Sequence, residues 1–105
     1  MTEPDFHRLV VELAELCGWL TFHDYDSRRS NPGFPDLVLV RPPRLIFAEL
    51  KSQGGRVRKH QEIWLAALGE CEVETYLWRP ADWPEIQEAL RRVRISAKTK
   101  AVSRG

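Results

Sequence analysis

The sequence predicts an α/β fold in which a small mixed β-sheet is flanked by helices. Apolar residues recur at the spacing of an amphipathic helix in three segments, which cover residues 2–17, 58–69 and 82–93. Shorter apolar or alternating runs, typical of strands, cover residues 19–25, 36–40, 45–51 and 72–78. This order of one helix, three strands, a helix, a strand and a last helix favours an α/β sandwich around one sheet.

Length and composition limit the chain to one globular domain. A chain of 105 residues can bury a modest core, and 43% hydrophobic with 30% charged residues is an ordinary composition. No apolar run approaches the roughly 20 residues of a membrane span, and there is no signal-peptide pattern at Met1, so we expect a cytoplasmic protein. We expect a single domain at residues 1–94 and a basic, mobile tail at residues 95–105.

The first helix has signals at both of its ends. Thr2 is a suitable N-cap, Pro4 falls in the first turn, and Asp5 can complete a capping box. Gly18 is the expected stop. Glu3 precedes two members of the apolar stripe by three and seven residues, so it lies at the N-terminal end of the buried side.

Two strands joined by a hairpin form the centre of the predicted sheet. Proline donates no N–H to a β-ladder, so residues 41–44, which contain two prolines, are predicted to be a four-residue loop. If Val40 and Leu45 close this loop, Asp36 falls directly opposite Glu49. Because side chains alternate between the faces of a strand, both carboxylates then share one face and the other face is apolar.

Polar segments connect the remaining elements. Residues 26–33 have the composition of a turn, and residues 52–55 are predicted to be a flexible connector to the second helix. Gln61 heads the apolar stripe of that helix, so it is expected to face the hairpin, and Gly69 is the expected helix end. Asp82 is expected to cap the last helix.

Neither histidine nor cysteine spacing indicates a zinc site or a redox motif. His7 and His23 are predicted to be surface or hydrogen-bonded histidines. Cys17 and Cys71 are predicted to be buried free thiols.

The opposed carboxylates indicate a cation site. Like charges opposite one another on neighbouring strands destabilise a sheet, since their Cβ atoms lie only about 4.5–5.5 Å apart. Mg²⁺ typically takes one or two carboxylates and shares the rest of its shell with waters and phosphates. Lys51, two residues beyond Glu49, could orient or deprotonate an attacking water, or meet charge that develops on phosphorus. An isolated Glu-x-Lys triplet is usually a solvated strand end, and the opposing Asp36 is what favours the functional interpretation.

These residues resemble a known nuclease motif. PD at residues 35–36, followed by ELK at residues 49–51, is similar to the PD-(D/E)xK motif. GFPD at residues 33–36, together with Gln61 ten residues beyond the lysine, resembles the VRR-NUC branch of that superfamily. The likeness covers roughly residues 2–80 and is similar to the small stand-alone members found in phages and bacteria.

The resemblance implies a restriction-endonuclease-like core and a DNA endonuclease that depends on Mg²⁺ or Mn²⁺. It implies a preference for branched or flapped DNA, including Holliday junctions, in a bacterial or phage-infected cell. It further implies that Asp36, Glu49 and the backbone carbonyl of Leu50 bind the metal, that Lys51 acts on the water, and that Gln61 lies at the active centre. One small protomer offers little surface for a four-way junction, so we expect a homodimer.

The acidic residue that the family carries on its first helix has two candidates here. Glu3 is the better match, and Glu12 is the alternative. A glutamate in a first turn is also favoured by the helix macrodipole alone, so both a functional and a structural interpretation of Glu3 remain open.

A basic segment surrounds the predicted site. Residues 28–60 contain eight basic and two acidic side chains, a net charge of +6, whereas the whole chain carries only +1. Basic side chains supply affinity for a phosphate backbone without reading bases, and no aromatic platform for base stacking is evident in the sequence. The candidate phosphate contacts are Arg28, Arg29, Arg41, Arg44, Arg56, Arg58 and Lys59.

The sequence leaves three functions open. The favoured one is a metal-dependent nuclease, because a pure binding module has no reason to oppose two carboxylates. The second is a nuclease-fold DNA-binding or assembly subunit that does not cleave, which the small size and the basic segment would also suit. The third is an exonuclease component that acts on DNA ends.

Overall fold

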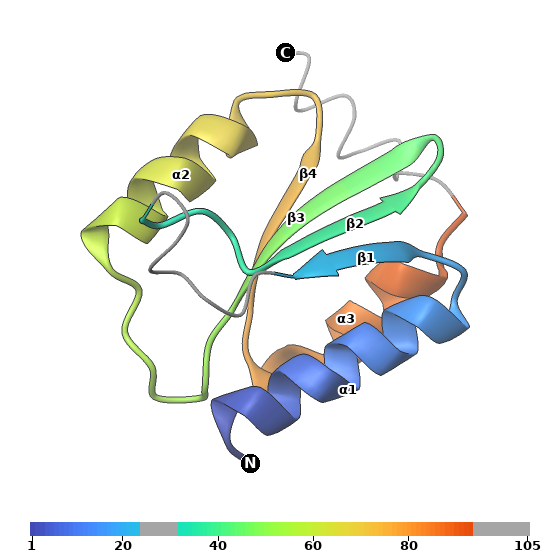
Figure 1. Cartoon of the computed structure of the whole chain (residues 1–105), viewed down its shortest axis with the longest axis horizontal. Helices are drawn as coiled ribbons and strands as arrows, with labels where there is room; N and C mark the ends of the chain where they lie inside the picture. The colour runs from blue at the N-terminus through green and yellow to red at the C-terminus, as the bar shows by residue number, and fades with distance from the viewer. Residues whose placement is uncertain (24–31, 94–105) are drawn as a thin grey trace.

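A four-stranded mixed β-sheet forms the centre of the protein, and helices lie on both of its faces (Figure 1). The computed structural model describes residues 1–23 and 32–93. Its elements, in chain order, are α1 (Glu3–Leu16), β1 (Leu20–His23), β2 (Leu37–Arg41), β3 (Arg44–Leu50), α2 (Lys59–Gly69), β4 (Glu74–Trp78), the short 3₁₀ helix η2 (Pro80–Asp82) and α3 (Trp83–Arg91). This order confirms the predicted α-β-β-β-α-β core with a C-terminal helix.

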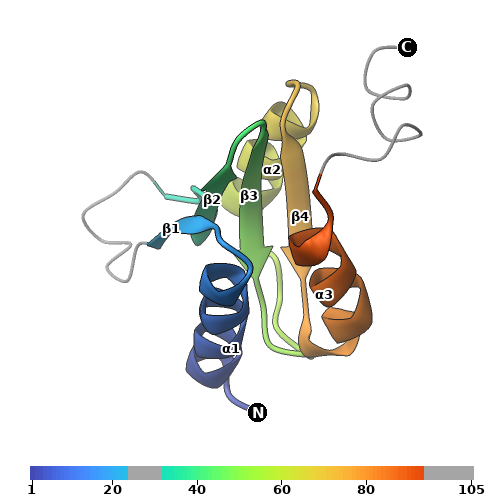
Figure 2. The same ribbon diagram turned by 90° about the vertical axis from the view of Figure 1, so that its right-hand side faces the viewer.

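The strands lie in the sheet in the order of the chain. β1, β2 and β3 are antiparallel neighbours, and β4 pairs parallel to β3. The parallel pair is possible because α2 crosses one face of the sheet and returns the chain to the starting end of β3. α1 and α3 cover the opposite face (Figures 1 and 2).

The main core lies between the sheet and the pair α1 and α3. Its buried side chains alternate along β2 and β3 and recur at helical spacing on the two helices, as the amphipathic patterns require. They are Phe6, Val10, Ala14, Trp19, Leu37, Leu39, Ile46, Ala48, Leu50, Trp78, Ile86, Ala89 and Leu90. The other sheet face is left for α2 and for the polar residues of the candidate site.

The start and the end of α1 follow the predicted signals. Thr2 Oγ1 accepts a hydrogen bond from the backbone N–H of Asp5 at 3.2 Å, and the Thr2 N–H donates to the Asp5 carboxylate at 3.4 Å. This is the reciprocal capping box. Gly18, with a φ of +88°, turns the chain out of the helix toward β1.

The hairpin has the predicted register but a shorter loop. Val40 pairs with Leu45 as expected, and the ladder extends one pair further to Arg41 and Arg44. The turn therefore consists of Pro42 and Pro43 alone. Both prolines fall where no ladder N–H is needed, which is why two of them are tolerated between paired strands.

Arg44 is not the solvent-exposed DNA contact that the sequence predicted. Its side chain is only 1% exposed, and its guanidinium donates to both carboxylate oxygens of Glu74 at 2.6 Å. It also donates to the carbonyls of Ala89 and Arg92 at the end of α3, each at 2.7 Å. A buried charge needs such partners, so the Arg44 guanidinium stabilises the interior of the protein and is not available to bind DNA.

Arg41 was also predicted to contact DNA, but its guanidinium is bound within the protein. Its guanidinium lies 4.5 Å from the centre of the Trp19 ring and donates to the carbonyls of Cys17 at 2.6 Å and Leu90 at 3.0 Å. Both arginines lie at the hairpin end of the sheet. The predicted catalytic residues lie at the opposite end of β2 and β3.

Several smaller predictions differ from the structure. The last helix was predicted to extend to residue 93 with an apolar residue at its end, but α3 ends at Arg91 and Val93 is 76% exposed. Cys17 and Cys71 are free thiols as predicted, yet Cys71 is exposed and Cys17 only half-buried. Asp82 occupies the N-cap position of α3, but its carboxylate accepts from the backbone N–H of Arg79 at 2.9 Å instead of from an N–H of α3.

Part of the predicted chain lies outside the described residues. Arg28 and Arg29 fall in the first gap, and residues 95–105, predicted to form the tail, fall in the second. Within the described ranges, none of the helices has the length and apolar character to cross a membrane.

Candidate active site

Asp36 and Glu49 meet at the end of the sheet where β2 begins and β3 ends. Leu37 pairs with Ala48, so the next position along the ladder brings Asp36 opposite Glu49, as the register predicted. Asp36 Oδ2 accepts a hydrogen bond from the backbone N–H of Leu50 at 3.0 Å. This bond holds the Asp36 carboxylate against the last residues of β3.

Glu49 is a buried carboxylate with one unsatisfied oxygen. Its residue is only 1% exposed, and Oε2 accepts from Gln61 Nε2 at 2.7 Å and lies 3.7 Å from Lys51 Nζ. Oε1 is buried and has no hydrogen-bond partner among the described residues. Burial first, and then the charge of Asp36, raise the pKa of Glu49 to about 8, although Lys51 opposes the rise.

Gln61 connects Glu49 to the start of α2. Its amide Nε2 donates to Glu49, and its Oε1 accepts from the backbone N–H of Arg58 at 2.8 Å. The prediction that Gln61 faces the hairpin is therefore confirmed. The rest of its stripe, Trp64, Leu65 and Leu68, is only half-buried and not buried as predicted, because α2 covers a smaller part of the sheet than α1 and α3 do.

The segment that leads to Asp36 docks against α2 through a glycine and an aromatic cluster. Phe34 packs edge to face against Phe47 and Trp64, with ring centres 6.1 Å and 5.0 Å away. Gly33 has a φ of +91°, and a Cβ there would lie 2.4 Å from the carbonyl oxygen of His60. Only glycine fits this approach, which sets the path of the chain into Asp36.

Gly33→Ala is expected to lower the free energy of unfolding by at least about 2 kcal/mol, because both the left-handed backbone and the contact with His60 oppose a methyl group. Urea denaturation measures the change. Gly54→Ala is the matched control: a Cβ there meets nothing within 4 Å, so stability should change by less than about 1 kcal/mol. Equal losses in the two variants would contradict this explanation.

Glu3, in the first turn of α1, reaches the same end of the sheet. Glu3 is half-buried, and its Oε2 accepts from the backbone N–H of Ser52 at 3.3 Å, directly after Lys51. Glu12 is exposed further along the helix, so the geometry favours Glu3 over the alternative.

His7 is the residue of this site that the sequence analysis missed. Its Nε2 lies 3.6 Å from Asp36 Oδ2, and its side chain is 18% exposed. The available signal was its spacing: His7 follows Glu3 by four residues, which places the two on the same face of α1.

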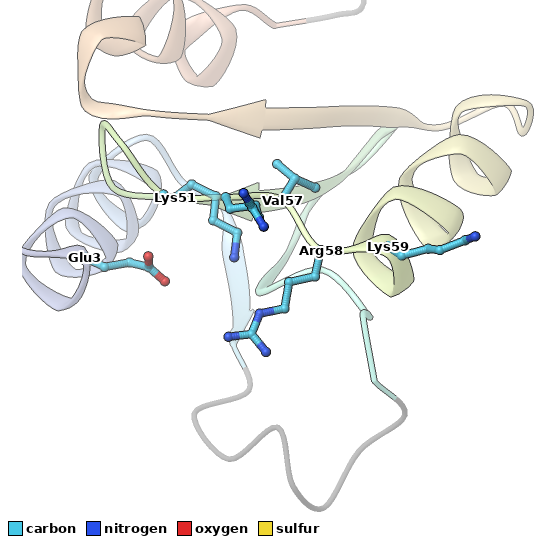
Figure 3. A pocket seen from close by; sticks show the side chains of 7 residues that line it. Glu3, Lys51, Val57, Arg58 and Lys59 are labelled. Carbon is cyan, nitrogen blue, oxygen red and sulfur yellow. The ribbon is translucent and has the colours of Figure 1, made fainter.

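An open pocket of about 690 Å³ lies beside Lys51. It is lined by Glu3, Lys51, Gly55, Arg56, Val57, Arg58 and Lys59. Figure 3 shows Glu3 and Arg58 on either side of Lys51, whereas the Lys59 side chain points away from Lys51. Four of the seven lining residues are basic, so the pocket suits a negatively charged ligand.

The connector between β3 and α2 is not the flexible segment that its composition predicted. The Gly55 N–H donates to the Ser52 carbonyl at 3.0 Å, which closes a turn. The Arg79 guanidinium donates to carbonyls of the same turn, at 2.8 Å for Ser52 and 2.7 Å for Gly55. Contacts from Arg79, the residue after β4, therefore order a segment that is rich in glycine.

The sequence matches the model of the VRR-NUC domain over residues 8–82. The chain belongs to the VRR-NUC family. This membership identifies a nuclease family and implies a DNA substrate for the VRR-NUC domain described here. The matched range contains Asp36, Glu49, Lys51 and Gln61, and it begins after Glu3. Searches of curated proteins and of solved structures find no match.

The donor set of this VRR-NUC domain suits a hard cation that needs few protein ligands. Within residues 1–23 and 32–93, no group of three or more His, Cys, Asp or Glu side chains could hold a metal ion. The donors that the structure brings together there are two carboxylates, Asp36 and Glu49. Mg²⁺ accepts such a set because it retains several waters, and the unpaired Oε1 of Glu49 is an oxygen that a cation would satisfy.

The raised pKa of Glu49 predicts that metal-free protein loses stability as pH rises. Between its ordinary pKa of 4.5 and about 8, the folded protein holds a proton on Glu49 that the unfolded chain has released. The stabilisation is thus complete below pH 4.5 and is lost as pH rises toward 8. In EDTA, the free energy of unfolding of Glu49→Gln relative to that of wild type should rise by about 2–4 kcal/mol between pH 5 and 8.5, the upper figure corresponding to the full shift. Urea denaturation at both pH values measures it.

The control for this titration is Glu85→Gln, which changes an exposed glutamate of α3. Its stability relative to wild type should not vary with pH. A constant difference between Glu49→Gln and wild type across the pH range would contradict the assigned titration.

Proposed function

We propose that this protein is a metal-dependent DNA endonuclease whose ligands for Mg²⁺ or Mn²⁺ are Asp36, Glu49 and the Leu50 carbonyl. The observation that carries the proposal is the meeting of two carboxylates around a buried and unpaired oxygen of Glu49. An ion bound there would act as a Lewis acid on the phosphodiester. This arrangement costs stability in the absence of a cation, so it favours catalysis over DNA binding alone.

The side chains around the carboxylates have separate roles in the proposed reaction. Gln61 holds Glu49 through its 2.7 Å hydrogen bond and so sets the direction of the carboxylate. Lys51 presents its ammonium at the side of the basic pocket, where it can orient or deprotonate the attacking water or stabilise charge on the phosphate. Glu3 completes the site from α1.

Affinity for DNA is proposed to come from the basic residues beside the pocket. Arg56, Arg58 and Lys59 are exposed, and they lie where a phosphate backbone would pass Lys51. Arg28 and Arg29 remain candidates of the same kind from the sequence. We propose that these contacts recognise the backbone and not the bases.

The experiment that tests the nuclease is cleavage of a panel of labelled DNAs: duplex, single strand, flap, four-way junction and covalently closed circle. Each is incubated with Mg²⁺, Mn²⁺ or EDTA. We expect metal-dependent cutting that is lost in Asp36→Ala, with branched DNA cut best and the circle also cut. Cutting of linear DNA alone would favour the exonuclease. Binding without cutting in either metal would favour the non-cleaving subunit.

We further propose a homodimer that acts in the cytoplasm of a bacterial or phage-infected cell. Two sites related by a two-fold axis would suit the symmetry of a four-way junction. Light scattering under cleavage conditions should give a mass close to twice 12.2 kDa. A monomeric mass would contradict the dimer and leave the chemistry of each site unaffected.

A further inference from the structure

Arg79 lies outside the proposed catalytic set, yet it organises the segment that follows Lys51. It is the first residue after β4, and its side chain reaches into the turn of residues 52–55. Nη1 donates to the carbonyls of Ser52 at 2.8 Å and Gly55 at 2.7 Å, and lies 3.5 Å from that of Gln53. Three carbonyl oxygens thus converge on one guanidinium.

Two more hydrogen bonds hold the same turn from both sides. Gln53 Oε1 accepts from the backbone N–H of Ala81 at 2.9 Å, and the Ser52 N–H donates to Glu3. The turn is therefore attached to α1 on one side and to the residues after β4 on the other. A segment of composition SQGG has no intrinsic preference for one conformation, so these contacts select it.

The turn leads directly into the basic wall of the pocket. Gly55, Arg56 and Arg58 line the pocket, and both arginine side chains are exposed. Long exposed side chains lose conformational freedom when they bind, and they lose more if their backbone must also become ordered. A backbone that is already held in place reduces this cost.

We infer that Arg79 is a positioning residue, which holds the turn of residues 52–55 so that Arg56 and Arg58 are prearranged to bind the phosphodiester backbone beside Lys51. The inference rests on the proposed function for the identity of the ligand. Arginine suits the role because its long side chain brings Nη1 within reach of all three carbonyls, whereas the shorter lysine side chain would end before that position.

Arg79→Lys tests the inference because it keeps the positive charge but shortens the side chain that brings Nη1 to the carbonyls. We expect a dissociation constant about five- to tenfold higher for a labelled four-way junction in EDTA, measured by fluorescence anisotropy. The cleavage rate at saturating DNA with Mg²⁺ should change less than about threefold, because the Lys51 backbone is held separately by its N–H bond to the Trp78 carbonyl at 3.0 Å. Arg91→Lys, an exposed arginine on α3, is the control and should bind as wild type does.

A double-mutant cycle separates positioning from a direct contact or a general loss of structure. In an Arg56→Ala/Arg58→Ala background, which by itself should weaken binding, Arg79→Lys should add less than about twofold, since nothing remains for Arg79 to position. Gln53→Ala, which removes the bond to Ala81, should weaken binding in the same direction if Arg79→Lys fails to fold.

Three outcomes would overturn the inference. These are wild-type affinity in both Arg79→Lys and Gln53→Ala, an equal effect of Arg79→Lys in both backgrounds, and wild-type affinity of the Arg56→Ala/Arg58→Ala protein. All are binding measurements made without metal. Failure of the proposed nuclease would instead appear as absent metal-dependent cutting, so the two failures are distinguishable.

Discussion

Lys51→Met is expected to lower the rate of DNA cleavage by about 10²- to 10⁴-fold while DNA affinity changes little. Lys51 is 9% exposed, and its ammonium lies 3.7 Å from the buried Glu49 carboxylate. At this depth it contributes little to long-range attraction of DNA, but it adjoins the oxygens that would surround the reacting phosphate. Methionine has similar length and suits a nearly buried position, so the substitution removes the charge with little change in packing.

The measurement is single-turnover cleavage of the preferred DNA at saturating protein, together with anisotropy in EDTA. Lys59→Met is the matched control, because Lys59 is exposed and its side chain points away from Lys51 (Figure 3). Loss of cleavage in Lys51→Met alone is the expected result. Lys51→Met should retain binding, whereas Lys59→Met should bind DNA more weakly but cleave at the wild-type rate at saturating protein, because Lys59 is one of the proposed phosphate contacts. Cleavage by Lys51→Met within tenfold of wild type would remove Lys51 from the chemistry.

Arg44→Met is expected to destabilise the protein by about 3–5 kcal/mol, a large part of the 5–15 kcal/mol that holds a typical domain folded. The substitution would leave the Glu74 carboxylate buried, with Tyr76 Oη at 2.8 Å and Arg92 Nη2 at 3.9 Å as its remaining partners. An uncompensated buried charge is the main cost. The Ala89 carbonyl at the end of α3 would also lose its donor.

Urea denaturation of Arg44→Met and of the double variant Arg44→Met/Glu74→Leu measures this effect. The double variant should recover at least half of the lost stability, because an apolar pair carries no buried charge. The pair lies at the hairpin end of the sheet, so folded Arg44→Met at low temperature should cleave DNA at close to the wild-type rate. A loss under about 1 kcal/mol in Arg44→Met would contradict the assigned role.

Tyr76 belongs to the same buried network. Burial, and then the hydrogen bond to Glu74, raise the pKa of Tyr76 to about 12, so its hydroxyl stays protonated and donates to Glu74 at neutral pH. The network thus joins β3, β4 and α3 at the end of the molecule opposite the candidate site. Stability and the proposed chemistry are separated along the length of the sheet.

Much of the candidate site followed from local rules of the sequence. The alternation of side chains along a strand, together with a short hairpin, determined that Asp36 and Glu49 are opposed and share a face, and the register observed for Val40 and Leu45 agrees with this. The helical spacing after Gln61 determined that its amide faces the hairpin, where it contacts Glu49. These relations involve residues close in the chain, so periodicity was sufficient to find them.

The tertiary structure alone decided which charged residues are available to a ligand. Arg41 and Arg44 belonged to the same basic segment as Arg56 and Arg58, but their partners Glu74 and the carbonyls of α3 come from 30 to 50 residues further along the chain. The approach of His7 to Asp36 and the hold of Arg79 on the connector also join distant segments. No local pattern encodes such contacts, because they exist only after α1, α3 and β4 have packed around the hairpin.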